Sequence, residues 1–597
     1  MEKIAVLDSG GQYCHLIARK VRDLGVYAEI LPVGTCAASL ADYRGIILSG
    51  GPSSVFDAKS PQPDPRLFQE GKPILGICYG HQLLAKHLGG LVERGRVHEF
   101  GSATLHVETP GGLFDGMQGR LSVWMSHGDQ VVRLPERFET LASTDECEVA
   151  AMGLPERGLY GLQFHPEVVH TPGGPAMLEN FLRNACGCSM DWHPKDRAGA
   201  LVRQIRADAR GRRVLFFLSG GVDSTVAYAL TVRALGASAV DAVYVDTGFM
   251  RDRETAEIEA AFRALDLGTL RVFDASGLFM DRLRGVSDPE CKRAIIGQAF
   301  VDVQDEILGG GSYEGQEWIL GQGTIYPDTI ESGDTHSSDV IKTHHNRVDR
   351  IRELLEQGRV LEPLSEFYKD EVRELGRALG LPGRLLERHP FPGPGLAIRC
   401  LCAADSEGPA ADPRIAALAE RYGYSAFMLP LRSVGVQGDN RSYARLTVLH
   451  GAELDYGRLL PLSTAITNKF RHTNRIVASV TPRRVEPLEW RIRPATLTRE
   501  RVALLQRVDR AVTEYLRASG LYDRVWQCPV VLLPWSRNGG ETVALRPITS
   551  VDGMTAAVAE LPSRGLLGLA RRLRRIGGVD SVLYDLSNKP PSTIEWE

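Results

Sequence analysis

The fold is decided by the stretch Val214-Leu215-Phe216-Phe217-Leu218-Ser219-Gly220-Gly221-Val222-Asp223-Ser224. Its first five residues are apolar and predict a buried strand, whereas residues 225–235 have apolar side chains at helical spacing. The two glycines let backbone N–H groups approach an anion closely, and the helix presents its positive N-terminal end to the same place. This strand–turn–helix unit therefore predicts a phosphate-binding loop in an α/β domain.

A Gly-Gly turn between a strand and a helix is also compatible with tight packing alone. The kinase-type pattern Gly-x-x-x-x-Gly-Lys-Ser/Thr does not occur in the chain. The hexapeptide Ser219-Gly220-Gly221-Val222-Asp223-Ser224 resembles instead the pyrophosphate loop of the N-type ATP pyrophosphatases. That resemblance implies an enzyme that cleaves ATP between its α and β phosphates and leaves an adenylylated substrate.

Length and charge limit the function classes that remain. A chain of 597 residues predicts about three to five domains. The formal net charge is −4, with 24% charged residues, so anionic ligands must be held by local sites rather than by a global field. We therefore expect neither a nucleic acid nor a membrane as a partner. The basic run at residues 571–575 predicts a solvated helix face.

Cysteine usage and the N-terminus predict a soluble, cytoplasmic protein. The ten cysteines show no Cys-x-x-Cys spacing, which favours reduced thiols over a zinc site. The chain enters a predicted strand at Ile4 without a charged leader, and no apolar span is long enough to cross a bilayer.

The first predicted domain, residues 1–190, alternates strand-like and helical patterns, as in an α/β fold around a mostly parallel sheet. Within it, Gly76-Ile77-Cys78-Tyr79-Gly80 has the form of a nucleophile elbow with cysteine in place of serine. The flanking glycines relieve crowding at a strained turn. A helix N-terminus favours the thiolate of Cys78, which is the attacking form.

The stretch Gly161-Leu162-Gln163-Phe164-His165-Pro166-Glu167 supplies a base for Cys78. We expect His165 to take the thiol proton and Glu167 to orient the imidazole. Taken alone, Cys78 is compatible with a buried core thiol and His165 with a structural loop histidine. Together they resemble the class I glutamine amidotransferases, which implies hydrolysis of the glutamine amide to glutamate and ammonia through a thioester.

The glutamine pocket is predicted around this triad. Backbone N–H groups at Gly51 and Tyr79 are the natural oxyanion donors. Gln82 and the stretch 126–129 are expected to hold the substrate, although Asp129 is also compatible with a turn or a helix cap. The predicted oxyanion and glutamine-binding residues are Gly50, Gly51, Tyr79, Gln82 and Asp129.

The second predicted domain covers residues 191–396, after a linker at residues 184–194. The strand predicted at 240–245 should end beside the phosphate loop, near the adenine or ribose. Asp223 and Asp246 are the candidate carboxylates for the magnesium of Mg-ATP. The predicted ATP-binding residues are Ser219, Gly220, Gly221, Val222, Asp223, Ser224, Val245 and Lys342.

A long polar segment, residues 324–346, is compatible with a lid or with a dispensable surface loop. We favour a lid that carries Lys342 to the phosphates. Adjacent histidines point apart in most backbones, so we do not expect zinc at His344 and His345.

The stretches 322–328, 342–346 and 389–396, joined to an amidotransferase and a pyrophosphate loop, resemble the glutamine-hydrolysing GMP synthetases. The resemblance implies that ATP adenylylates xanthosine monophosphate (XMP). Ammonia from glutamine then displaces AMP, giving GMP, with pyrophosphate as the other product. The resemblance implies Mg²⁺ and no organic cofactor.

The third predicted region, residues 397–597, contains a diverged internal repeat of an α+β subdomain, at about 397–490 and 491–597. It resembles the longer family form with two copies of a dimerisation subdomain, and it leaves a monomer and a homodimer open. The last residues, 589–597, are compatible with a frayed terminus. In the family this tail folds over XMP.

By that resemblance the nucleotide pocket consists of Arg293, Asp439, Arg441, Gln527, Lys589, Ile594 and Glu595. Two departures from the family pattern affect individual contacts. Cys291 stands where a charged residue is usual, and the second copy lacks a clear Gly-Asp-x-Arg.

Three rival functions stay open. The first is another adenylating amidotransferase, such as one that makes NAD or asparagine. Those families pair the same loop with a different glutaminase, so the set of Cys78, His165 and Glu167 disfavours this function. A nucleic-acid-binding or tRNA-modifying protein is disfavoured by net acidity. A regulatory nucleotide-binding protein without catalysis is disfavoured by the intact triad and loop.

Overall fold

The computed structural model describes residues 2–597 except for residues 12, 58, 169, 266, 311, 312, 314–317, 333–353, 355, 356, 438, 439 and 551–554. The side chains of residues 95–98, 100, 330–332, 436, 437 and 440–442 also fall outside the description. The described chain forms two compact units, one that ends at Arg197 and one that begins at Ala198.

The first unit is built on a nine-stranded sheet in the order β2-β1-β3-β4-β9-β8-β7-β5-β6. The first five strands in that order are parallel and the other four are antiparallel. The strands are β1 (Lys3–Asp8), β2 (Tyr27–Pro32), β3 (Gly45–Leu48), β4 (Ile74–Ile77), β5 (Leu91–Val107), β6 (Arg120–Arg133), β7 (Glu139–Ser143), β8 (Ala151–Leu154) and β9 (Leu159–Leu162). The helices are α1 (Cys14–Asp23), α2 (Tyr79–His87) and α3 (Gly174–Asn180).

Alternation along β1 explains why helices cover both faces of this sheet. Ile4 and Val6 belong to the core that contains Ile17 of α1. Ala5 and Leu7 belong to the core on the other face, which contains residues of α2. A strand that is buried on both faces must be apolar where it is buried, and the four buried residues of β1, from Ile4 to Leu7, are all apolar.

The segment predicted as a linker packs onto the first unit. Cys186, Cys188 and Trp192 are buried, and both cysteines belong to the core of this unit. The cysteine- and proline-containing pattern predicted a linker, and the structure adds that these three apolar side chains are buried, because burial removes their apolar surface from water.

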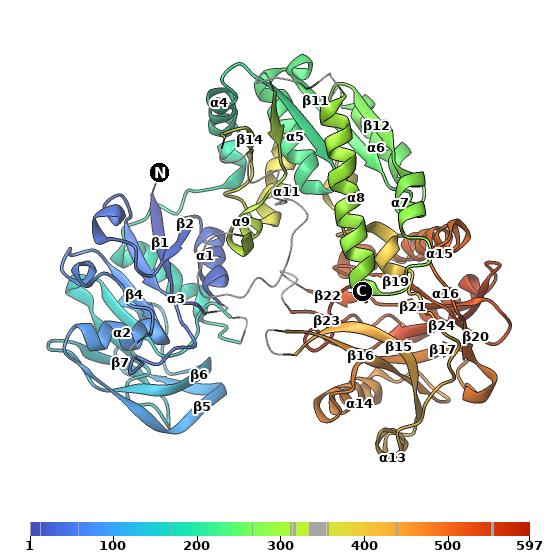
Figure 1. The fold of residues 1–597 in the computed structure, drawn as a ribbon. Coiled ribbons are helices and arrows are strands. Elements are labelled where there is room, and N and C mark those ends of the chain that lie inside the picture. The colour runs from blue at the N-terminus through green and yellow to red at the C-terminus, as the bar shows by residue number, and fades with distance from the viewer. Residues whose placement is uncertain are drawn as a thin grey trace. The chain divides into compact units, whose positions relative to one another are not determined.

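The second unit begins with a five-stranded parallel sheet in the order β12-β11-β10-β13-β14 (Figure 1). The prediction of an α/β domain with a parallel sheet around the phosphate loop is therefore confirmed. The strands are β10 (Arg213–Leu218), β11 (Val240–Asp246), β12 (Leu270–Asp274), β13 (Trp318–Gly321) and β14 (Val360–Leu361). The helices are α4 (Ala198–Ala209), α5 (Val222–Leu235), α6 (Glu254–Ala264), α7 (Ser276–Arg282), α8 (Pro289–Gly309), α9 (Tyr326–Ser332), α11 (Lys369–Ala378) and α12 (Gly383–Leu386).

The same unit contains a six-stranded sheet in the order β15-β16-β17-β24-β21-β19. Its strands are β15 (Ser425–Gln437), β16 (Asn440–His450), β17 (Thr473–Thr481), β19 (Val530–Leu533), β21 (Glu541–Leu545) and β24 (Val579–Asp585). Its helices are α13 (Pro413–Arg421), α14 (Tyr456–Lys469), α15 (Arg499–Ala518) and α16 (Ser563–Leu573). Four short strands, β18 (Arg491–Ile492), β20 (Trp535–Ser536), β22 (Ile548–Thr549) and β23 (Ala557–Val558), form two separate pairs.

The two halves of the six-stranded sheet mirror each other. From each edge inward, an antiparallel pair is followed by a parallel pair, β15-β16-β17 on one side and β19-β21-β24 on the other. The parallel crossovers run through α14 and α16, and β17 pairs antiparallel with β24 in the middle. This arrangement supports the predicted repeat, whose residue boundaries stay predictions.

One hydrophobic core joins the two sheets of the second unit. It contains Leu215 of β10 and Ile296 of α8, together with Leu505 of α15 and Leu545 of β21. The boundary predicted near residue 396 therefore lies inside one compact unit.

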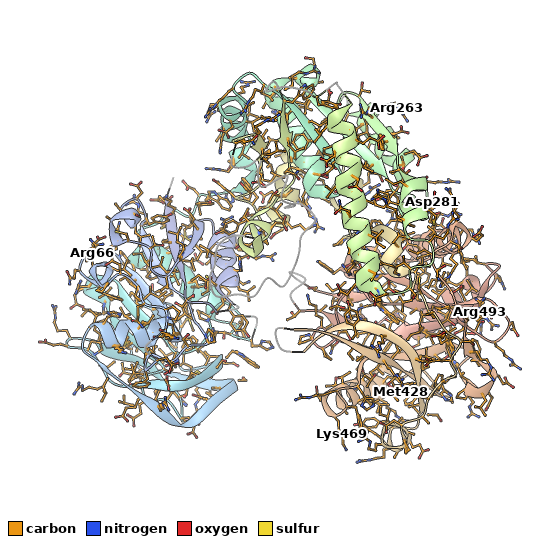
Figure 2. The ribbon with its side chains drawn as sticks, viewed as in Figure 1. Arg66, Arg263, Asp281, Met428, Lys469 and Arg493 are labelled. Atoms are coloured by element: carbon orange, nitrogen blue, oxygen red, sulfur yellow. The ribbon has the colours of Figure 1, made fainter. Side chains whose placement is uncertain are left out.

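Charged surface side chains pair locally. Arg66, labelled in Figure 2, lies 2.6 Å from Asp64, and Asp281 lies 2.6 Å from Arg284. Exposed pairs of this kind contribute little to stability, because water and salt screen the two charges. Among the described residues, no helix combines the length and apolarity that a membrane crossing requires.

Candidate active sites

Cys78 sits in a strained turn between β4 and α2. Its φ of 51° lies in the left-handed region although it is not a glycine. A Cβ added to Gly76 would lie 2.4 Å from the carbonyl oxygen of Gly80, so the turn closes only because glycine stands there. This is the geometry predicted for a nucleophile elbow, with the thiol at the start of a helix.

His165 and Glu167 complete a buried cluster with Cys78. Nδ1 of His165 lies 2.7 Å from Oε1 of Glu167, and both side chains are almost fully buried. Gly50 lies between the base and the nucleophile, because a Cβ there would be 3.1 Å from Cε1 of His165 and 3.5 Å from Cβ of Cys78. The structure therefore brings the three predicted triad residues together.

The electrostatic surroundings of His165 favour the imidazolium. Burial opposes the charge, but the carboxylate of Glu167 and the thiol of Cys78 outweigh it and raise the pKa of His165 to about 10. A base whose proton affinity depends on these two neighbours is suited to carry a proton from the nucleophile to a leaving group.

The predicted glutamine-binding residues surround the same cluster. Nε2 of Gln82 donates to the carbonyl oxygen of Asp129 at 2.8 Å, and the hydroxyl of Ser54 donates to Oδ2 of Asp129 at 2.5 Å. Tyr79 is the first residue of α2, and Gly51 packs against Ser9, whose carbonyl oxygen would be 2.6 Å from an added Cβ. Asp129 lies in the middle of β6, so the turn or helix-cap alternative is wrong.

Gln163 was not predicted from the sequence. Its Nε2 lies 3.9 Å from Sγ of Cys78, and its Oε1 accepts from Gln82 at 3.3 Å. Sγ of Cys78 also faces the carbonyl oxygen of Ser126 at 3.6 Å. The only sequence signal for Gln163 is its position two residues before His165, directly after β9.

The phosphate loop joins β10 to α5, as predicted. Gly220 has a φ of 73°, and the N–H of Gly221 donates to Oγ of Ser219 at 3.3 Å. The hydroxyls of Ser219 and Ser224 are 3.2 Å apart, and Val222 begins the helix. The loop is open to solvent at Ser219 and Gly221, which suits a site for an anion.

Asp223 in this loop has one bound and one unbound carboxylate oxygen. Nζ of Lys369, at the start of α11, lies 3.2 Å from Oδ2 of Asp223. Oδ1 is buried and has no hydrogen-bond partner among the described residues. Lys369 was not predicted, because nothing in the sequence near residue 369 marks it as a neighbour of a loop 146 positions away.

Asp246, the other candidate magnesium ligand, ends β11 next to the buried Val245. Its Oδ1 accepts from the N–H of Gly248 at 2.9 Å, and its Oδ2 accepts from the hydroxyl of Thr255 at 2.8 Å. Both oxygens therefore hold the turn after β11. Within the described ranges, no group of three or more His, Cys, Asp or Glu side chains could hold a metal ion.

The C-terminal tail folds back into the second unit, so the frayed-terminus alternative is wrong. Ser592 and Trp596 are fully buried. In Figure 1 the C-terminus lies beside α8, where Lys292 and Arg293 bind Glu597.

Predicted nucleotide-binding residues meet at this tail. Glu595 pairs with Arg399 through contacts of 2.7 and 3.0 Å, and Gln527 donates to Glu595 at 3.2 Å. The carbonyl oxygen of Ile594 accepts from Arg546 at 3.0 Å. Lys589 lines a cavity of about 520 Å³ with Thr549, Ser550, Thr555, Ala556, Ala557, Asn588 and Pro590. Arg399 and Arg546 were not predicted.

Three predicted site residues and most of the predicted lid fall outside what the structure describes. Lys342 and Asp439 lie in segments without a description, as does most of the proposed lid, and the side chain of Arg441 is likewise not described.

Comparisons with known proteins agree with this organisation. The family described as glutamine amidotransferase class-I matches residues 5–185, and the GMP synthase C terminal domain matches residues 514–596. Each match is to a family of domains and covers one end of the chain.

Relatives match over much longer stretches. A probable glutamine-hydrolysing GMP synthase of Leptospira interrogans is 42% identical across 100% of this chain and 99% of its own. The GMP synthase of Thermus thermophilus is 40% identical across 100% of both chains. The GMP synthase of an Azoarcus species is 43% identical, but its match covers 82% of this chain and 99% of its own.

Proposed function

This chain belongs to the glutamine-hydrolysing GMP synthase family, and we propose that it aminates XMP to GMP with ammonia from glutamine. ATP adenylylates the purine, and AMP and pyrophosphate are released. The observation that carries the proposal is the buried set of Cys78, His165 and Glu167, with 2.7 Å between the base and its orienting acid. It occurs in one chain with a Ser-Gly-Gly-Val-Asp-Ser loop.

In the glutaminase step, Sγ of Cys78 attacks the side-chain amide carbon of glutamine while His165 takes the thiol proton. The oxyanion forms against the N–H groups of Gly51 and Tyr79. His165 then returns the proton to the leaving ammonia, and a thioester remains. Water attacks the thioester, glutamate leaves, and the thiol regains its proton. Glu167 keeps the imidazole oriented and stabilises its charged form.

In the synthetase step, the oxygen on C2 of XMP attacks the α phosphate of ATP. The bond to the β phosphate breaks, and pyrophosphate leaves into the loop from Ser219 to Ser224. Ammonia then attacks C2, and AMP leaves with the oxygen that was adenylylated. Adenylylation is needed because an oxygen on C2 is otherwise a poor leaving group.

Magnesium would accompany ATP, where it neutralises phosphate charge. Oδ1 of Asp223 suits it, because this buried oxygen is unpartnered among the described residues and lies in the phosphate loop. Asp246 suits it less well, because both of its oxygens hold the turn at Gly248 and Thr255. Lys342, from the lid, would add positive charge at the phosphates.

The domain division proposed from the sequence is retained, with a glutaminase at 1–190, a pyrophosphatase at 191–396 and two C-terminal copies at about 397–490 and 491–597. The nucleotide pocket would use Arg293, Asp439, Arg441, Gln527, Lys589, Ile594 and Glu595. Ten free cysteines support a reducing, cytoplasmic location. Either a monomer or a homodimer is compatible with the fold.

The test is GMP formation from XMP and Mg-ATP by the wild type and by Cys78→Ala, each with glutamine or with an ammonium salt. We expect the variant to lose only the glutamine-dependent reaction. If the wild type releases pyrophosphate but makes no GMP from either nitrogen source, XMP is the wrong acceptor.

A further inference from the structure

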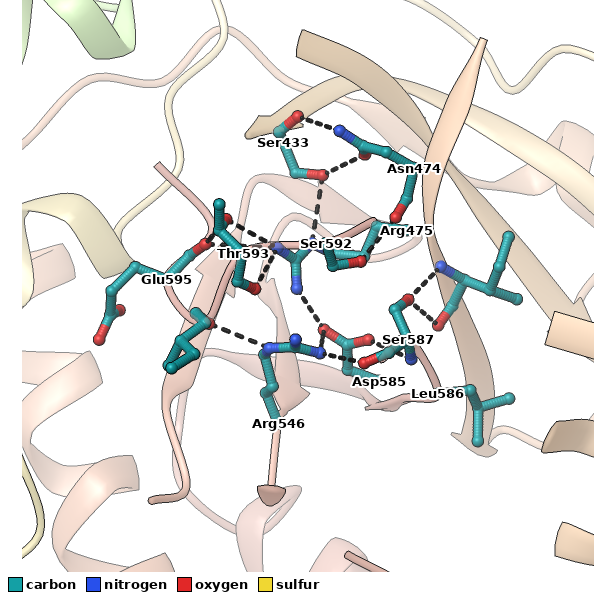
Figure 3. Close-up of polar contacts among 12 residues, drawn as sticks. Ser433, Asn474, Arg475, Arg546, Asp585, Leu586, Ser587, Ser592, Thr593 and Glu595 are labelled. Atoms are coloured by element: carbon teal, nitrogen blue, oxygen red, sulfur yellow. Dashed lines mark hydrogen bonds and ion pairs between the residues drawn. The ribbon is translucent and has the colours of Figure 1, made fainter. Parts of the chain in front are cut away.

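Two buried arginines hold the main chain of the C-terminal tail (Figure 3). Nη2 of Arg475 donates to the carbonyl oxygens of Thr593 at 3.0 Å and of Glu595 at 3.3 Å. Nε of Arg546 donates to the carbonyl oxygen of Ile594, between them, at 3.0 Å. Three consecutive carbonyl groups are thus fixed, and this fixes the direction in which the side chain of Glu595 leaves the tail.

The charge of the two arginines is matched only in part by a carboxylate. Asp585 lies 2.6 Å from Arg475 and 2.9 Å from Arg546, and all three side chains are fully buried. A buried cation needs a full set of acceptors. Arg475 also donates to Ser433 and Val434, and Arg546 donates to the carbonyl oxygen of Ser587. The tail carbonyls add three further acceptors, which are present only when the tail is in place.

The arginines come from different halves of the mirrored sheet. Arg475 of β17 is in register with Leu446 of β16, directly after an irregularity in the pairing. Ser581 of β24 is in register with Thr542 of β21, after the same irregularity. Ser581 therefore occupies, in the second half, the position that Arg475 occupies in the first.

The outer strands support this register. Leu429 of β15 pairs with Leu446, and Leu533 of β19 pairs with Thr542. Each of these outer leucines is followed by a proline. Four residues beyond the mirrored positions, the first half has Ser479 where the second half has Asp585.

We propose that Arg475 is a positioning residue for the nucleotide pocket, supplied by the first half of the sheet to the tail of the second half within one chain. The first half lacks the acid, because Ser479 stands at its place, and its segment equivalent to the tail is Leu488-Glu489-Trp490. There Glu489 pairs with Arg537 rather than with a buried arginine. One chain therefore holds one such site. The proposal rests on the proposed function, because it takes the tail to be the part that contacts XMP.

The first experiment uses Arg475→Gln with ammonium as the nitrogen source, so that the glutaminase plays no part. Losing a charge-assisted contact to two carbonyl groups should raise the KM for XMP about 10- to 100-fold. The KM for ATP should stay within about 2-fold of the wild type, because the phosphate loop does not contact Arg475. Arg475→Lys should have a KM for XMP between those of Arg475→Gln and the wild type. Lysine keeps the positive charge but lacks the planar guanidinium that donates to several acceptors at once.

The matched control is Ser581→Ala at the mirrored position. Ser581 is fully buried, and its hydroxyl has no hydrogen-bond partner among the described residues. We expect its KM for XMP to equal that of the wild type.

The second measurement is amide hydrogen exchange of the peptide covering residues 592–597, without nucleotide. If Arg475 holds the tail, Arg475→Gln should speed this exchange at least about 10-fold and leave the β16 and β24 peptides unchanged. Unchanged tail exchange together with an unchanged KM for XMP overturns the proposal.

If Arg475→Gln does not fold, Thr593→Val takes its place in the experiment. Thr593 is a half-buried residue of the tail, and its hydroxyl donates to the carbonyl oxygen of Val434 at 2.9 Å and lies 3.4 Å from Nη2 of Arg475. Valine removes this hydroxyl and leaves Arg475 in place. A wild-type KM for XMP in that variant counts against the proposal. If the wild type makes no GMP from XMP, the proposed function fails, whereas tail exchange still decides whether Arg475 holds the tail.

Discussion

The nucleophile elbow and the phosphate loop are both turns from a parallel strand into a helix, but they differ in the residue that takes the left-handed backbone. At the elbow it is Cys78 itself, with a φ of 51°, whereas in the loop it is Gly220, with a φ of 73°. A non-glycine residue in this region costs about 1–2 kcal/mol. The elbow accepts strain because it must present a side chain, and the loop avoids it because it presents backbone N–H groups.

The two turns also differ in how they are completed. The elbow finds its base and orienting acid in one short stretch, His165 to Glu167, and the cluster is buried. The loop is open, and its partner Lys369 comes from a distant helix. Substitutions should therefore separate the two sites cleanly.

The largest expected effect is at the elbow. His165→Ala should lower glutamine-dependent GMP formation about 10⁴-fold, because it removes the base that moves the thiol proton. Both nitrogen sources are compared under initial-rate conditions. If ammonium-dependent GMP formation falls by the same factor, the substitution affects more than the glutaminase step.

Gly220→Val should have the opposite selectivity. A side chain at this φ distorts the loop, so ATP-dependent GMP formation should fall about 10³-fold with either nitrogen source, while glutamine hydrolysis continues. Gly236→Val, at a φ of 86° with no atom within 4 Å of an added Cβ, is the matched control for strain alone. Equal losses in both variants would point to misfolding.

A smaller effect is expected from Glu167→Gln, because Glu167 acts through His165. Glutaminase turnover should fall about 100-fold. Ammonium-dependent synthesis should not change. A turnover equal to that of the wild type would remove Glu167 from the triad.

The same variant tests the pH dependence of stability. Folding raises the pKa of His165 to about 10, above its unfolded value of about 6.5. The stabilisation is therefore complete below about pH 6.5 and is lost as the pH rises to about 10. The free energy of unfolding of the wild type, measured with a denaturant, should fall by a few kcal/mol over this pH range. That of Glu167→Gln should fall by about 1 kcal/mol or less. If the free energy of unfolding changes with pH equally in the wild type and in Glu167→Gln, Glu167 is not the group that raises the pKa of His165.

The smallest effect is expected from Lys369→Met in the loop. Losing one positive charge beside Asp223 should raise the KM for Mg-ATP about 10-fold. The free energy of unfolding should change by about 1 kcal/mol or less, because this ion pair is partly exposed. Lys369→Arg serves as the control, and an unchanged KM in Lys369→Met would place Lys369 outside the phosphate site.

Local signals explain what the sequence predicted well. The strands β3, β4 and β10 are short apolar runs, and Cys78, His165 and the phosphate loop lie in motifs whose chemistry is local. Gln163, Lys369, Arg399 and Arg475 were missed because their partners are distant in the chain. The sequence predicts residues 184–194 as a linker, but the packing of Cys186, Cys188 and Trp192 depends on contacts with the first unit that no local pattern shows.

The C-terminal tail is the last part of the chain to be synthesised. Its anchors, Lys292, Arg399, Arg475 and Arg546, are all synthesised long before residues 593–597 leave the ribosome. The first unit, by contrast, closes its elbow with residues no later than Glu167. Since domains fold in the order of synthesis, a nascent chain would complete the elbow first, and the tail would reach its anchors only when the final residues emerge.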